Sequence, residues 1–180
     1  MTRSGHDPLL LAAHVLLWLF IGALCFALIM VGIGLPAAAI FQDQIIAEAA
    51  SKGITAGPEL VGAVLLVMAC VLVFLGLAVY FLVLLLRIVG SVKEGDPFIA
   101  INAERLSRMG WIALAGQIAT IPLAAIVLWI DKLVGDVEGV HIDADLGVSG
   151  EGLLLVLILF ILARVFRNGA EMRDELEGTV

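Results

Sequence analysis

Charged side chains are scarce in this chain: Asp, Glu, Lys and Arg together make up 15% of its 180 residues. Soluble globular domains carry about 25% charged residues. Hydrophobic residues make up 62% of the chain, and the mean hydropathy is +1.15. This composition excludes a water-soluble domain and indicates an integral membrane protein whose length suits a single domain.

Basic residues are also few, with 10 Lys and Arg against 17 Asp and Glu. Proteins that bind nucleic acids gather basic side chains on one face, where they contact phosphates. The sequence contains no such basic cluster. We therefore expect no direct binding to nucleic acid.

Residues that carry chemistry form no recognisable motif. The two cysteines, Cys25 and Cys70, lie inside apolar runs, where a free thiol is more common than a disulfide between helices. At membrane depth there is no Ser or Cys beside a base, no paired acid and base, and no metal-ligand cluster. We expect no enzymatic activity and no cofactor.

Three long stretches lack Asp, Glu, Lys and Arg: residues 8–42, 60–86 and 109–130. Each is long enough for a transmembrane helix, which needs about 20 apolar residues. The first is also too long for the apolar part of a cleaved signal peptide, which runs about 7 to 15 residues. We expect it to remain as the first membrane span.

A fourth charge-free stretch, 152–163, has only 12 residues. With flanks it reaches about 20 residues, placing Glu151 near one interface and Arg164 near the other. The sequence therefore predicts an all-α fold, a four-helix transmembrane bundle, with three spans as the alternative. The four expected spans are residues 9–35, 60–86, 109–130 and 147–166.

The first helix would be longer than the membrane is thick if it continued to Phe41. At about 1.5 Å per residue it would reach about 50 Å, against a hydrocarbon core of about 30 Å. Gly32, Gly34 and Pro36 favour a break, because glycine loosens a helix and proline removes a backbone donor. A short interfacial helix is expected to follow over residues 37–50.

The orientation follows from the Lys and Arg residues of the short connections. Under the positive-inside rule, both termini, loop 87–108 and tail 167–180 are expected to be cytoplasmic. Loops 36–59 and 131–146, which are acidic, are then extracytoplasmic. Eight basic residues lie on the cytoplasmic side and two on the other: Arg3, Arg87, Lys93, Arg105, Arg108, Arg164, Arg167 and Arg173, against Lys52 and Lys132.

The cytoplasmic loop contains a helix-start signal, because Asp96 is a good N-cap and Pro97 a good first helical residue. The predicted amphipathic helix places Glu104 and Arg108 four residues apart, where they can pair. This segment is either the juxtamembrane start of the third span or a docking surface for a cytoplasmic partner protein. The residues expected to contact a partner, including two from the tail, are Asp96, Phe98, Asn102, Arg105, Arg108, Arg167 and Glu171.

The tail alternates charges at helical spacing. Arg167 and Glu171, and Arg173 and Glu177, stand four residues apart, as in a solvated helix. Either the last helix simply continues into water, or the tail forms a contact site together with segment 96–108.

The loop and the tail resemble a known family. Residues 95–98 read Gly-Asp-Pro-Phe, residues 102–106 Asn-Ala-Glu-Arg-Leu, and residues 109–110 Met-Gly. With the Arg, Gly, Glu and final aliphatic pattern of the tail, they resemble the bacterial four-span integral membrane family catalogued as domain of unknown function 2975. The resemblance covers roughly residues 84–180, and the first half of the chain matches by hydropathy alone.

The resemblance implies a multi-pass protein of the bacterial cytoplasmic (inner) membrane. Members of the family are often encoded beside a small helix-turn-helix regulator, which the resemblance offers as the cytoplasmic partner. It implies a regulatory or sensory role and no established activity.

Polar residues within the spans need partners or a function. His14 is either an interfacial imidazole or a proton or ligand site. Gln117 is expected to hydrogen-bond between helices, unless it lines a path for solute. Glu151 faces either the interface or the bundle.

One weak metal candidate lies in the second extracytoplasmic loop. His141, Asp143 and Asp145 alternate with apolar residues, so that a strand would place all three on one face. The alternatives are a divalent-ion site and a solvated acidic hairpin, and no metal site is predicted.

Two functions remain in competition. The first is a sensory or regulatory membrane component that binds a cytoplasmic partner. The alternative is a small transporter or channel subunit, oligomeric because four spans enclose little volume. Its support is the polar and helix-bending group Gln117, Thr120 and Pro122 in the third span.

Overall fold

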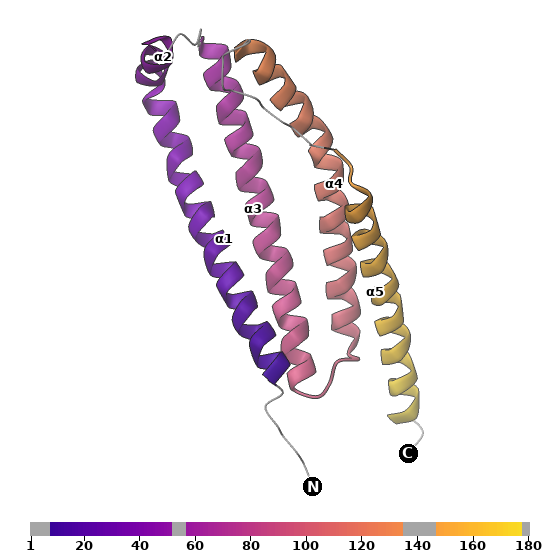
Figure 1. Ribbon diagram of the computed structural model, residues 1–180. Helices are drawn as coiled ribbons and strands as arrows, with labels where there is room; N and C mark the ends of the chain where they lie inside the picture. The colour runs from indigo at the N-terminus through magenta and orange to yellow at the C-terminus, as the bar shows by residue number, and fades with distance from the viewer. Residues whose placement is uncertain (1–7, 52–56, 135–146, 178–180) are drawn as a thin grey trace. The chain divides into compact units, whose positions relative to one another are not determined.

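The computed structural model describes residues 8–51, 57–134 and 147–177, and these parts of the chain are helical almost throughout (Figure 1). They contain five helices and no strand, which confirms the all-α prediction. Four of the helices are long and apolar enough to cross a membrane. The helices are α1 (Pro8–Ile40), α2 (Gln42–Ser51), α3 (Pro58–Lys93), α4 (Ala100–Val134) and α5 (Gly150–Glu177).

Large apolar side chains cover the outside of these helices. Leu19 on α1 is 68% exposed and Trp111 on α4 is 63% exposed. Water would penalise such a surface, whereas lipid tails are as apolar as the side chains themselves. The exposed apolar surface is therefore the lipid-facing surface of a multi-pass membrane protein.

The predicted break in the first helix is wrong. α1 continues through Gly32, Gly34 and Pro36 to Ile40, and the Phe41 N–H still donates to the Ala37 carbonyl at 2.9 Å. Proline removes a single backbone hydrogen bond, and in an apolar environment a full break would leave further groups unsatisfied. The expected short helix exists as α2, which begins at Gln42 and turns away from the axis of α1 (Figure 1).

The helices extend past the expected spans. α3 has 36 residues and α4 has 35, so that each is more than 50 Å long at about 1.5 Å per residue. The hydrocarbon core of a bilayer is about 30 Å thick. Both helices therefore project into the aqueous or interfacial layer, where their polar ends can form a structure outside the lipid.

The helices form two compact units, and each is described by itself. The first contains Met1–Cys25, Leu77–Ala115 and Gly150–Val180. Its core joins α3, α4 and α5. Phe160 of α5 lies against Gly110 of α4, where a Cβ atom would stand 3.1 Å from the ring. The buried core residues are Leu84, Ile88, Leu106, Met109, Leu159 and Ala163.

The second unit contains Phe26–Gly76 and Gly116–Ser149. Within it Gly34 of α1 faces the Met68 side chain of α3, and a Cβ atom on Gly34 would lie 3.3 Å from the Met68 Cε atom. The glycine lets α1 approach α3 closely, as small residues do between membrane helices.

Candidate functional site

The α3–α4 loop, residues 94–99, lies at the same end of the first unit as the end of α5 (Figure 1). α3 ends in a Schellman motif: Gly95 N–H donates to the Val92 carbonyl and Asp96 N–H to the Ser91 carbonyl, each at 3.1 Å. Gly95 has a φ of 84°, a conformation that glycine adopts at little cost. The loop therefore leaves α3 at a defined angle.

The predicted N-cap at Asp96 is wrong. α4 begins at Ala100, and residues 97–99 are not helical. The backbone of Asp96 is used to close α3, and its carboxylate forms an ion pair with Arg173 of α5. The local start signal at Asp96 and Pro97 is therefore overridden by the end of one helix and by a contact with another.

Asn102 holds this loop from inside. Its side chain is completely buried, at 0% exposure. The amide nitrogen donates to the Ser91 hydroxyl oxygen at 2.6 Å and to the Pro97 carbonyl at 2.9 Å. The amide oxygen accepts a hydrogen bond of 2.9 Å from the Arg105 guanidinium. One side chain thus joins α3, the loop and α4, which fixes the position of residues 97–99.

Two residues expected to contact a partner are instead part of this internal network. Asn102 cannot contact a partner while it is fully buried. Arg105 is half-buried, and besides Asn102 it donates to the Arg87 carbonyl at 3.3 Å. Both residues position the loop.

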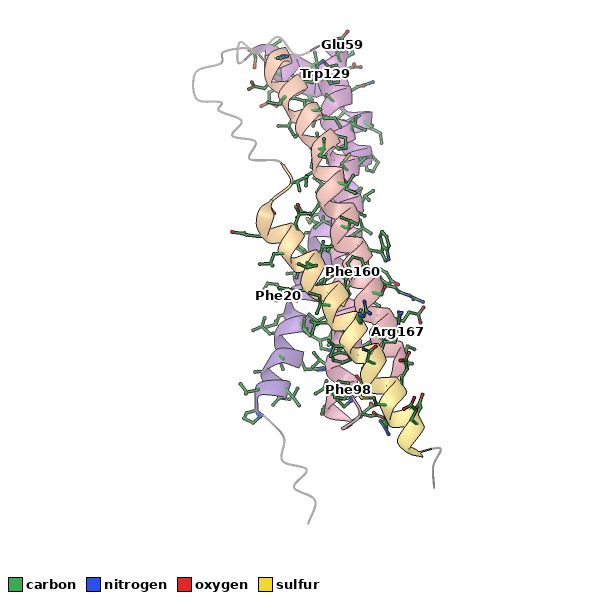
Figure 2. All side chains as sticks on the ribbon, turned by 90° about the vertical axis from the view of Figure 1, so that its right-hand side faces the viewer. Phe20, Glu59, Phe98, Trp129, Phe160 and Arg167 are labelled. Atoms are coloured by element: carbon green, nitrogen blue, oxygen red, sulfur yellow. The ribbon has the colours of Figure 1, made fainter. Side chains whose placement is uncertain are left out.

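The end of α5 packs on the same loop. The Phe98 and Phe166 rings lie 5.1 Å apart at an interplanar angle of 40°, and Figure 2 shows Phe98 near the start of α4, beside α5. Gly169 lies so close that a Cβ atom there would stand 2.8 Å from Phe98 Cδ1. A larger residue at position 169 would displace the Phe98 ring.

The ion pair between Asp96 and Arg173 adds a second contact. Their side chains are 41% and 45% exposed, respectively, so water and salt screen the attraction. Such pairs contribute about 0–1 kcal/mol to stability. The end of α5 is thus held against the loop by contacts of modest strength.

A pocket of about 230 Å³ lies between the loop and the end of α5. We call it the loop–tail pocket. Its lining combines apolar groups with an acid on each side and a guanidinium, an arrangement suited to an apolar side chain flanked by charges. The lining residues are Asp96, Phe98, Ile99, Ala100, Ala170, Arg173 and Asp174.

Of the seven residues expected to contact a partner, two line this pocket: Asp96 and Phe98. Arg108 pairs with Glu104 at 2.6 Å on the exposed side of α4, as its spacing predicted. Arg167 and Glu171 are exposed on α5 and lie outside the pocket lining.

The sequence interpretation did not name the other five lining residues, which are Ile99, Ala100, Ala170, Arg173 and Asp174. The adjacent small residues Gly169 and Ala170 in an otherwise charged tail were the available signal, since small residues mark close helix approach. That signal indicates contact but does not identify what is contacted.

The polar residues of the spans have separate environments. The His14 Nε2 atom accepts a hydrogen bond from the Trp18 indole at 3.3 Å, four residues along α1. The Gln117 amide oxygen accepts from the Ser149 N–H at 3.1 Å. Ser149 precedes α5 and is not helical, so this bond joins α4 to a connecting segment and not, as expected, to another helix. Glu151 is exposed in the first turn of α5.

The weak metal candidate, formed by His141, Asp143 and Asp145, lies outside the described residues. Among residues 8–51, 57–134 and 147–177 no group of three or more His, Cys, Asp or Glu could hold a metal ion. Cys25 and Cys70 are free thiols, as expected.

Comparison with known proteins assigns the chain to a family. Residues 38–180 match the family described as Protein of unknown function (DUF2975), a range that includes α2 to α5 and exceeds the 84–180 covered by the resemblance in sequence motifs. No curated protein and no solved structure matches the chain. With four membrane-spanning helices and a family match over most of its length, the chain belongs to the DUF2975 family of multi-pass membrane proteins.

Proposed function

We propose that this protein is a non-catalytic sensory or regulatory component of the bacterial cytoplasmic membrane that binds a cytoplasmic protein at the loop–tail pocket. The observation that carries the proposal is the pocket itself, with Phe98 43% exposed beside it. Protein interfaces centre on aromatic anchors surrounded by polar groups. The lining has this character.

The size of the pocket favours a protein side chain as its occupant. Sites for small molecules and cofactors usually measure about 300–1,000 Å³, whereas this pocket measures about 230 Å³. A partner that inserts one apolar side chain beside Phe98 and Ile99 fits the lining. A small helix-turn-helix regulator is the candidate partner that the family resemblance suggests.

Filling the pocket tests the proposal. Ala100 lines the pocket and is exposed, so Ala100→Trp places an indole there without entering the core. We expect the amount of partner that co-purifies from native membranes in mild detergent to fall about tenfold, equivalent to about 1.4 kcal/mol of binding free energy. Quantitative mass spectrometry of the purified material measures the change.

Ile101→Trp is the matched control, because Ile101 is the next residue, is 49% exposed and does not line the pocket. We expect this variant to retain its partner. Equal recovery from the two variants, in stably expressed protein, would contradict docking at the pocket.

The proposed orientation has its own test. In a variant whose Cys25 and Cys70 are replaced, Asn168→Cys should react with a membrane-impermeant maleimide only after the cells are permeabilised. Ser51→Cys, an exposed position at the end of α2, should react in spheroplasts. This pattern follows from eight basic residues on one side and two on the other. Labelling of Asn168→Cys in intact spheroplasts would reverse the topology and place the pocket outside.

A further inference from the structure

The two walls of the loop–tail pocket differ in how firmly they are held. One wall, the α3–α4 loop, is fixed by the Schellman motif at Gly95 and by the buried hydrogen bonds of Asn102. The other wall is the end of α5, residues 167–177, which lies beyond the core residues Leu159 and Ala163. The loop is therefore the rigid wall.

Besides Ala170, which is buried at 5% exposure, the α5 wall is held by two contacts that are more exposed. The Asp96–Arg173 ion pair is more than two-fifths exposed on each side, so water and salt weaken it. The Phe98 ring contacts Phe166 and Gly169, and it stays 43% exposed. Neither contact is buried like Asn102.

A flexible point lies where the wall begins. Gly169 has no side chain to stabilise the helix, and glycine is a frequent site of helix bending. Ala170, which follows it, is 5% exposed and lines the pocket. Bending at Gly169 would move Arg173 and Asp174 away from the loop and would uncover Ala170.

We propose that residues 167–177 form a hinged lid on the loop–tail pocket, that the Asp96–Arg173 ion pair holds the lid closed, and that the partner protein binds the open form. That the lid controls binding of the partner rests on the proposed function. The charge pair then sets how much of the protein is competent to bind, since affinity scales with the fraction of molecules in the open form.

Charge reversal and charge exchange test the lid on the purified full-length protein. Arg173→Asp should repel Asp96 and open the lid, raising amide hydrogen exchange in residues 167–177 several-fold. The double variant Asp96→Arg with Arg173→Asp should restore slow exchange, because the pair re-forms with its charges exchanged. Arg167→Asp makes the same charge change on the same helix outside the pocket lining and should raise exchange less than Arg173→Asp does, because it affects only a local pair on the helix.

Rescue by the double variant separates the ion pair from a local effect on helix stability. If exchange stays high in the double variant, or does not rise in Arg173→Asp, the ion pair does not close the lid and the proposal is overturned.

Partner recovery supplies the second readout. We expect more partner to co-purify with Arg173→Asp than with the wild type, and less with the double variant than with Arg173→Asp. Unchanged or reduced recovery from the open variant would overturn gating. If exchange responds as expected but no variant recovers a cytoplasmic protein, docking and gating both fail, while closure of the lid by the ion pair is supported.

Discussion

Replacing the buried Asn102 with leucine is expected to lower the free energy of unfolding by about 3 kcal/mol, which is a large effect for a single substitution. Leucine has nearly the same size but leaves the Pro97 carbonyl and the Arg105 guanidinium without their shared partner. A buried polar group that loses its hydrogen bond costs about 1–3 kcal/mol. The apparent midpoint of thermal unfolding in detergent, measured at one fixed scan rate, reports the change.

Asn168→Leu is the control for Asn102→Leu, because Asn168 is exposed on α5. The same chemical change there should shift stability by less than about 0.5 kcal/mol. If both variants unfold at the same temperature, Asn102 does not hold the loop in the way its hydrogen bonds indicate.

Gly110→Leu is expected to cost about 2–3 kcal/mol, because it forces a side chain into the α4–α5 contact. A Cβ atom alone would stand 3.1 Å from both Cε1 and Cζ of Phe160. The Phe160 ring also makes an edge contact with Trp111, with centroids 5.5 Å apart and planes at 80°, which leaves it little room to retreat. Apparent thermal stability in detergent and the fraction of monodisperse protein measure the effect.

Gly116→Leu is the matched control on the same helix, since a Cβ atom at Gly116 meets nothing within 4 Å. It should be neutral or slightly stabilising, because leucine favours the helix over glycine. Adding Phe160→Ala to Gly110→Leu should recover part of the lost stability if the clash is with the ring. A loss of equal size at positions 110 and 116 would contradict the close packing.

The all-α fold and the four spans were predictable from the sequence. Stretches such as 60–86 and 109–130 lack charge over the length of a bilayer, and a chain in lipid must satisfy its backbone hydrogen bonds internally, which favours helices. The family was predictable for a similar reason, because its motif residues are adjacent in sequence at 95–110 and in the tail. Both the spans and the family motifs depend only on which residues stand close together along the chain.

Local signals were misleading where distant parts of the chain compete for the same groups. Asp96 and Pro97 predict a helix start, yet Asp96 closes α3 and pairs with Arg173. Pro36 predicts a break, yet the helix continues to Ile40, because an apolar environment penalises every further unsatisfied backbone group.

The loop–tail pocket could not be predicted from the sequence, because tertiary structure alone brings its residues together. Asp96 and Arg173 are 77 residues apart, and no spacing rule along the chain connects them. Asn102 illustrates the same point: its sequence position suggested a contact for a partner, whereas packing buries it completely. Hydropathy and helical periodicity specify which residues leave water and which share a helix face. Which helix ends meet, and hence which side chains form a pocket, depends on how α4 and the α3–α4 loop pack against α5 at Gly110 and Gly169.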